Sequence, residues 1–170
     1  RRCAGAVGGD GEGEALGGML REGGEGVCDA LKGGLGKSAD GAVVTEIGRR
    51  QRGGAHTRKH RRGWLRPTPS AVPLPVQPAT AATVLEPLGV ALVIAPWNYP
   101  VQLALAPLVG ALAAGNAVLL KPSELAPTVA RTLAELLPRY LDPTAVAVVQ
   151  GGVELTTAVL AERFDHIFFT

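Results

Sequence analysis

The chain has 170 residues, of which 46% are apolar and 19% charged, a composition typical of a globular protein. Its formal net charge of +2 is too small to indicate a polyanionic partner for the chain as a whole. Cys3 and Cys28 form no CxxC motif, so neither a disulfide framework nor a zinc knuckle is indicated, and a cytoplasmic protein with reduced thiols is expected. No run of about 18 apolar residues is present, so no membrane span is predicted.

Residues 1–66 are predicted to form an N-terminal helical segment, with helices at Glu14 to Leu35 and Thr45 to Leu65. Glycine is concentrated in this part, because 18 of the 23 glycines lie between positions 5 and 63. A glycine inside a helix costs roughly 0.8 to 1 kcal/mol relative to alanine. If these helices form, tertiary packing must stabilise them.

Residues 67–85 are predicted to be a proline-rich connector that crosses the surface and leads into an edge strand near Ala81 to Leu85. Five prolines lie between Pro67 and Pro78. Proline lacks the N–H group that helix interiors and central strands require, so neither is expected here.

Beyond Glu86, apolar strand patterns alternate with helical ones. Strands are predicted at 88–95, 116–121, 145–150 and 166–170, and helices at 101–114, 127–137 and 153–163. Such alternation indicates right-handed βαβ crossovers and a parallel sheet. The predicted fold class is α/β, a partial Rossmann-like parallel sheet preceded by the N-terminal helical segment. Residues 86–170 would then form an incomplete dinucleotide-binding domain.

Asn98 is the first candidate for a functional side chain. It follows an apolar strand and lies between Pro96 and Pro100, which should end the strand and fix the turn. Ligands of open α/β sheets bind at the carboxyl ends of the strands. Asparagine is also common in turns for local reasons, so an ordinary turn residue is the alternative.

Lys121 and Glu124 follow the second predicted strand and can point toward one ligand. In dinucleotide folds a carboxylate at this place accepts hydrogen bonds from ribose hydroxyls, and an ammonium group donates to them. The alternative is a capping signal, Ser123-Glu124, at the start of a helix. Both roles can hold at once.

Several other patterns carry no predicted site. Gly33-Gly-Leu-Gly-Lys-Ser38 imitates a phosphate-binding loop, but that motif requires glycine where Leu31 stands. His56 and His60 have helical metal-ligand spacing without a third ligand, so no metal is predicted. Cys28 and Cys3 receive no catalytic role.

Eight positive charges lie between Arg49 and Arg66 with no acidic residue among them. A basic interaction module that binds nucleic acid is one interpretation of this run. A solvated helix face or connector is favoured, because no aromatic interleaving or nucleic-acid fold motif accompanies it. No nucleic-acid partner is therefore predicted.

Five motifs, at their order and spacing, resemble the aldehyde dehydrogenase superfamily, most closely its class 3-like members. They are Glu86-Pro-Leu-Gly, Pro96-Trp-Asn-Tyr-Pro, Ala113-Ala-Gly-Asn-Ala-Val, Lys121-Pro-Ser-Glu and Arg163-Phe-Asp-His-Ile-Phe. Upstream, Leu35-Gly-Lys-Ser and Thr45-Glu-Ile-Gly resemble the helical region of that family more weakly. The resemblance covers most of this chain but only the first third to half of a family member.

The resemblance implies NAD(P)-dependent oxidation of an aldehyde to a carboxylic acid through a cysteine thiohemiacetal. It implies that Asn98 is the side-chain half of the oxyanion hole and that Lys121 and Glu124 bind the adenosine ribose. The cofactor would be NAD, with NADP possible, and the full-length protein a homodimer. The further cofactor-binding residues that it implies are Ala95, Pro96, Trp97 and Ser123.

The resemblance also implies that the cysteine nucleophile and the glutamate base lie beyond Thr170. Because the chain begins with Arg1 and not with methionine, we expect a fragment that lacks its native start. Without the nucleophile and the base, this fragment is itself expected to be inactive. The alternative is a decayed, non-enzymatic remnant that keeps a partial nucleotide-binding surface.

Overall fold

A four-stranded parallel sheet organises the fold in this computed structural model, which describes residues 8–170, with side chains described except at 8–10, 39 and 49–53. The strands are β3 (Val90–Ile94), β4 (Ala117–Lys121), β5 (Val146–Val148) and β6 (His166–Phe169). They lie in the order β5-β4-β3-β6, and each neighbouring pair is parallel. The α/β prediction is confirmed, and all four predicted strands are present.

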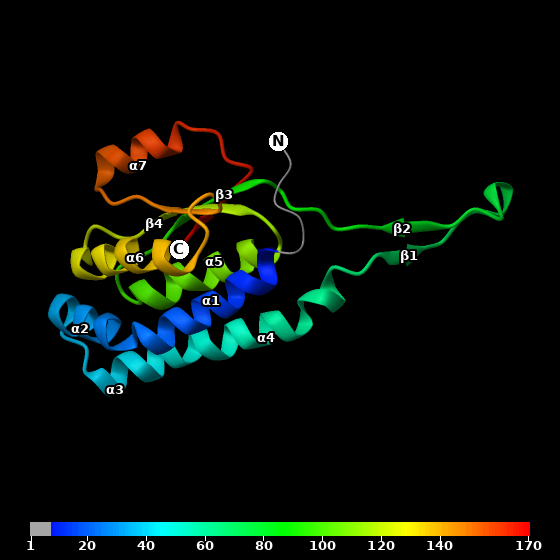
Figure 1. Cartoon of the computed structure of the whole chain (residues 1–170). Coiled ribbons are helices and arrows are strands. Elements are labelled where there is room, and N and C mark those ends of the chain that lie inside the picture. Colours follow the sequence, from blue (N-terminus) through cyan, green and yellow to red (C-terminus); the bar gives the residue numbers. More distant parts are fainter. Residues whose placement is uncertain (1–7) are drawn as a thin grey trace.

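Helices cover both faces of the sheet (Figure 1). On one face lie α5 (Pro100–Ala113) and α6 (Pro127–Tyr140), and on the other lies α7 (Val153–Leu160). The prediction that the 127–137 helix ends before Pro138 is wrong. Pro138 falls in the last turn of α6, where the buried side chains of Leu137 and Leu141 keep the chain against the core.

The N-terminal segment forms helices in a further layer beyond α5 and α6 (Figure 1). They are α1 (Gly8–Glu22), α2 (Gly24–Leu35), α3 (Ala39–Ala42), the π-helix η1 (Val43–Ile47) and α4 (Gly48–Trp64). The predicted helix over 14–35 is therefore two helices, which are separated at Gly23. Helix formation in 45–65 is confirmed, although its first residues are π-helical.

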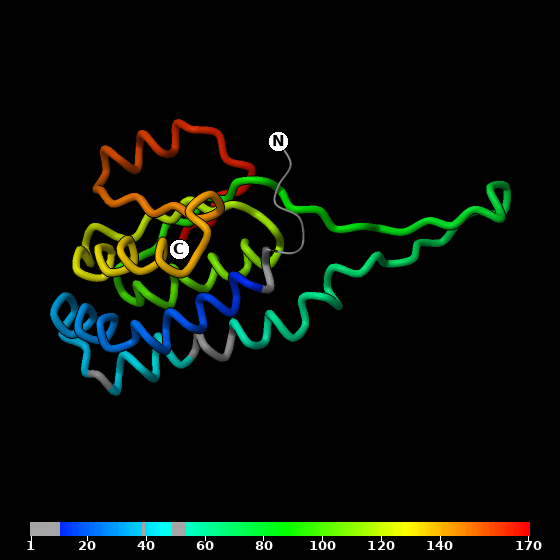
Figure 2. Tube along the Cα trace, viewed as in Figure 1, coloured from blue at the N-terminus to red at the C-terminus, as the bar shows by residue number. Residues whose placement is uncertain are grey.

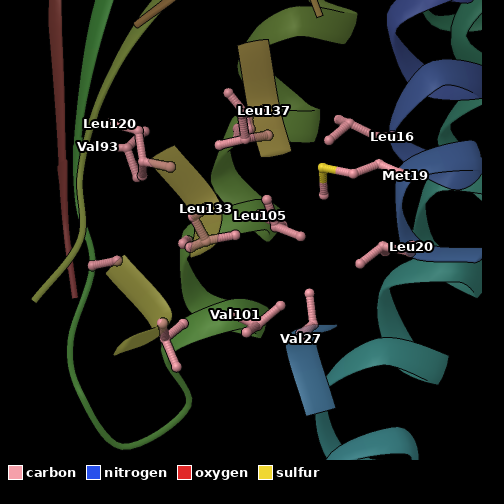
Figure 3. Packing of buried hydrophobic residues seen from close by; sticks show 14 of the residues in the cluster. Leu16, Met19, Leu20, Val27, Val93, Val101, Leu105, Leu120, Leu133 and Leu137 are labelled. Carbon is pink, nitrogen blue, oxygen red and sulfur yellow. The ribbon is translucent and has the colours of Figure 1, made fainter. Parts of the chain in front are cut away.

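One apolar core joins this layer to the sheet (Figure 3). Leu16 and Met19 of α1 point toward Leu105 of α5 and toward Leu133 and Leu137 of α6, and all five are at most 4% exposed. This packing explains how helices with so many glycines persist. The division into 1–66, 67–85 and 86–170 stays a prediction, but the core is continuous across its first and third parts.

The proline-rich segment forms an arm that projects away from the rest of the chain (Figure 2). Its strands β1 (Thr68–Ser70) and β2 (Ala81–Thr83) pair in antiparallel register, and the 3-10 helix η2 (Leu74–Val76) lies between them. The prediction of a connector across the surface is wrong, because this pairing folds the segment back on itself. A strand does form near residue 81, but it belongs to the arm and not to the edge of the parallel sheet.

Three of the sequence motifs meet at the amino end of β3. The N–H of Gly89 donates to Asn116 Oδ1 at 2.9 Å, and the N–H of Val90 donates to Asp165 Oδ2 at 2.8 Å. Gly89 has a φ of +130°, and a Cβ atom there would overlap the Asp165 carboxylate. These motif residues connect the strands at their amino ends, whereas the predicted site lies at the carboxyl ends.

We predict that Leu133→Ala lowers the free energy of unfolding by about 2 to 5 kcal/mol, because Leu133 is fully buried between the sheet and the helical layer. The matched control is Leu125→Ala, since Leu125 is 66% exposed. Urea unfolding of both variants measures the difference. Equal losses in the two variants would contradict the proposed position of the core.

Candidate active site

Two neighbouring strands bring the predicted site residues to the same edge of the sheet. Ile94, the last residue of β3, is in register with Lys121, the last residue of β4. The N–H of Ala95 then donates to the carbonyl oxygen of Lys121 at 3.0 Å, which continues the ladder one step further. The turn that carries Asn98 and the turn that carries Glu124 therefore leave the sheet side by side.

Asn98 presents its carboxamide as a hydrogen-bond donor. Its Oδ1 accepts from the N–H of Tyr99 at 3.0 Å, so the oxygen end of the amide faces the backbone. Among the described residues, Nδ2 has no hydrogen-bond partner, and the side chain is exposed. The NH₂ group is therefore available to an acceptor outside this part of the protein.

The two prolines around Asn98 act as predicted on the backbone. Pro100 is the first residue of α5, where its missing N–H costs nothing, and Pro96 follows the buried end of β3. Trp97 is 52% exposed and lies between them, while Ala95 is buried. Trp97 is thus open to a ligand, and Ala95 can offer only backbone or close-packing contacts.

Lys121 and Glu124 do come together, as an ion pair between Nζ and Oε2. The Lys121 side chain is only 5% exposed, whereas that of Glu124 is 40% exposed. The hydrogen bond from Lys121 is the main cause that lowers the pKa of Glu124 below its usual value of 4.5. Glu124 is therefore an ionised acceptor that a ligand can reach, and no hydrogen bond links this pair to Asn98.

The alternative role of Ser123-Glu124, as a capping signal for the next helix, is not found in the structure. Helix α6 begins at Pro127, its N-cap is Ala126, and no side chain caps it. The Oγ of Ser123 instead accepts from the N–H of Leu125 at 3.2 Å, inside the turn that precedes the helix. Because Pro127 has no N–H and fixes φ, it suits the first position of the helix, which starts at the predicted residue.

Sequence reasoning missed Lys37 and Glu46, which contact the turn around Asn98. Lys37 Nζ donates to the backbone oxygen of Asn98 at 3.0 Å and forms an ion pair with the fully buried Glu46. Both residues lie in the weaker upstream motifs, to which no role was given. One available signal was Tyr99, a poor N-cap residue, which implies that a distant group must cap α5.

The histidine and cysteine patterns to which no site was assigned lie on the N-terminal helices, His56 and His60 on α4 and Cys28 on α2. The rings of His56 and His60 lie tilted against each other on α4 with centroids 4.2 Å apart, and no group of three or more metal-ligating side chains occurs in the described part of the chain. Burial is the main cause that raises the pKa of the Cys28 thiol, which disfavours the reactive thiolate. Cys3 and the side chains of Arg49, Arg50 and Arg52 lie outside the described residues.

Comparison with known proteins decides the family. Residues 42–170 match the model of the aldehyde dehydrogenase family. The chain belongs to this family. It is 44% identical over 157 residues to aldehyde dehydrogenase family 3 member B3 of Mus musculus, covering 92% of this chain and 33% of that protein. It is 45% identical over 157 residues to family 3 member B1 of Homo sapiens, again covering 92% of this chain and 34% of that protein.

A solved structure of Staphylococcus aureus AldH in a substrate-bound state has the same fold. Its TM-score is 0.91 at 35% identity, and the match covers 95% of this chain and 35% of that one. The resemblance found from the sequence, to class 3-like aldehyde dehydrogenases, is confirmed. The chain spans about a third of the length of the curated relatives that it matches.

We predict that Lys121→Met raises the pKa of Glu124 toward 4.5, because the hydrogen bond that favours the carboxylate is lost. A lowered folded-state pKa stabilises the protein above the pKa of the unfolded chain, and this contribution is lost as the pH falls through the folded-state value. Side-chain carboxyl NMR of the labelled protein measures the titration, with Lys121→Arg as the control that keeps a cation. An unchanged Glu124 titration in Lys121→Met would contradict the pairing.

Proposed function

We propose that the full-length protein oxidises an aldehyde to a carboxylic acid with NAD(P), through a thiohemiacetal on a cysteine beyond residue 170. The observation that carries this proposal is the Asn98 carboxamide, whose oxygen is bound to the Tyr99 N–H and whose NH₂ group is free to donate. The family membership supports the same reaction class. Residues 8–170 would supply the oxyanion donor and part of the cofactor site, so this segment alone is expected to be inactive.

Asn98 would act on the charge that develops at the aldehyde oxygen. When a thiolate attacks the carbonyl carbon, that oxygen becomes an oxyanion, and a fixed N–H donor stabilises it. An amide suits this role because it donates without titrating at physiological pH. A nicotinamide cofactor, with its ribose held by Glu124 and Lys121, would supply the acceptor for the hydride from the tetrahedral carbon.

The residues at the end of β4 fit the ribose of such a cofactor. Glu124 is ionised and 40% exposed, so its carboxylate can accept from ribose hydroxyls. The buried Lys121 holds that carboxylate in place through the ion pair. A carboxylate at this place disfavours a 2′-phosphate, so we propose NAD as the preferred cofactor, with NADP possible. We propose Ala95, Pro96, Trp97 and Ser123 as the further cofactor contacts.

The full-length protein is proposed to be a homodimer. The support is the projecting arm (Figure 1), which contacts little of its own chain and in which Leu74 is 87% and Val76 54% exposed.

Among the described residues, no helix has the length and apolar character that a membrane span requires. We propose a cytoplasmic location, in keeping with the free thiol of Cys28.

We predict that Asn98→Ala lowers kcat of the full-length protein by about a hundred- to a thousandfold, because one oxyanion donor is lost. The measurement is the absorbance of the reduced cofactor with an aldehyde and NAD. The matched control is Asn116→Ala, the other asparagine of the chain, which bonds Gly89 and Ala111 and should lower the stability and not kcat. If the intact protein has no activity, the alternative of a non-enzymatic remnant replaces this proposal.

We predict that Glu124→Gln raises the KM for NAD by about tenfold and reduces the preference for NAD over NADP, because an ionised acceptor for the ribose hydroxyls is lost. Steady-state kinetics with each cofactor at saturating aldehyde measures both effects. Glu135→Gln is the control, since Glu135 is exposed on α6. An unchanged ratio of the KM values for NAD and NADP would show that Glu124 does not contact the ribose.

A further inference from the structure

The Glu46 carboxylate caps α5 from outside that helix. Its Oε2 accepts from the N–H of Val101 at 2.8 Å and from the N–H of Gln102 at 3.2 Å. These first-turn groups have no partner within a helix. Tyr99 at the N-cap makes no side-chain cap, and Pro100 has no N–H. The acceptor for the first turn of α5 is therefore supplied by η1.

Lys37 connects this carboxylate to the turn itself. Its Nζ forms an ion pair with Glu46 Oε1 and donates to the backbone oxygen of Asn98 at 3.0 Å. The same ammonium group lies 4.3 Å from the centroid of the Tyr99 ring. Glu46 has no exposed surface, and a buried carboxylate is stable only with a partner. The ion pair and both of its contacts with the turn thus form one network.

The network holds the Asn98 turn at both ends. Lys37 binds the carbonyl of Asn98, and Glu46 binds the N–H groups three and four residues later. Between these anchors, Oδ1 of Asn98 accepts from the N–H of Tyr99, so the direction of Nδ2 follows the backbone of the turn. A displacement of the turn would move the donor by the same amount.

We propose that Glu46 and Lys37 are positioning residues for the Asn98 carboxamide in the oxyanion hole, an inference that rests on the proposed function. The N-terminal helical segment then has a role in the reaction, because Lys37, in the loop after α2, and Glu46, in η1, fix the position of the donor. A misplacement of about 1 Å of a catalytic group can lower a rate on the order of a hundredfold.

Coupling between Lys37 and Asn98 tests the proposal in the full-length protein. Lys37→Met should lower kcat/KM for the aldehyde about tenfold and leave the KM for NAD unchanged, because only the donor is displaced. In an Asn98→Ala background, Lys37→Met should lower kcat/KM for the aldehyde by less than about twofold, since no donor remains to be displaced. Lys37→Arg, which keeps the positive charge, should retain most of the activity. Lys32→Met is the control, since Lys32 is exposed. Equal losses in both backgrounds would overturn the proposal.

A second measurement does not depend on activity. Hydrogen exchange at the amides of Val101 and Gln102 should be faster by about tenfold or more in Lys37→Met and in Glu46→Gln, because the acceptor is no longer held in place. Lys32→Met should leave both amides protected. Unchanged exchange in Lys37→Met, whose side chain is 21% exposed in the wild type, would refute the network even if Glu46→Gln does not fold. If the intact protein proves inactive, the proposed function fails, and the exchange rates alone decide whether the pair holds the turn.

Discussion

The buried carboxylate of Glu46 links the helical layer to the turn at the end of β3. Its two oxygens reach the first turn of α5 and the ammonium group of Lys37, which in turn binds the backbone of Asn98. A charge with no exposed surface is tolerated only when its hydrogen bonds are complete. The geometry of the candidate oxyanion donor therefore depends on residues that lie more than fifty positions upstream.

The motifs that identify the family have different physical roles. Gly89, Asn116 and Asp165 meet at the amino end of β3, where the side-chain oxygens of Asn116 and Asp165 accept from the backbone N–H groups of Gly89 and Val90. The motifs that carry Asn98 and Glu124 lie at the opposite edge and present exposed polar groups. Only the second set is proposed to take part in the reaction, whereas the first set connects the strands at their amino ends.

The sequence predicted the sheet well, because uninterrupted apolar strands between proline and glycine signals leave few alternatives. It placed Asn98 and Glu124 at strand ends for the same reason. It did not predict the projecting arm around Leu74, since proline spacing excludes structures without revealing which segments pair. It also missed the role of Glu46, because the bond between Glu46 and Val101 joins positions 55 apart and leaves no periodic pattern. Whether each site residue contacts its ligand stays a prediction.

In the proposed reaction, the Asn98 carboxamide donates to the oxygen of the reacting aldehyde. The most direct test is a crystal structure of the full-length protein with the cofactor and an aldehyde bound. We expect Nδ2 of Asn98 at about 3 Å from the aldehyde oxygen, with Oδ1 still bound to the N–H of Tyr99. An Asn98 side chain that points into solvent, more than about 5 Å from that oxygen, would contradict the claim.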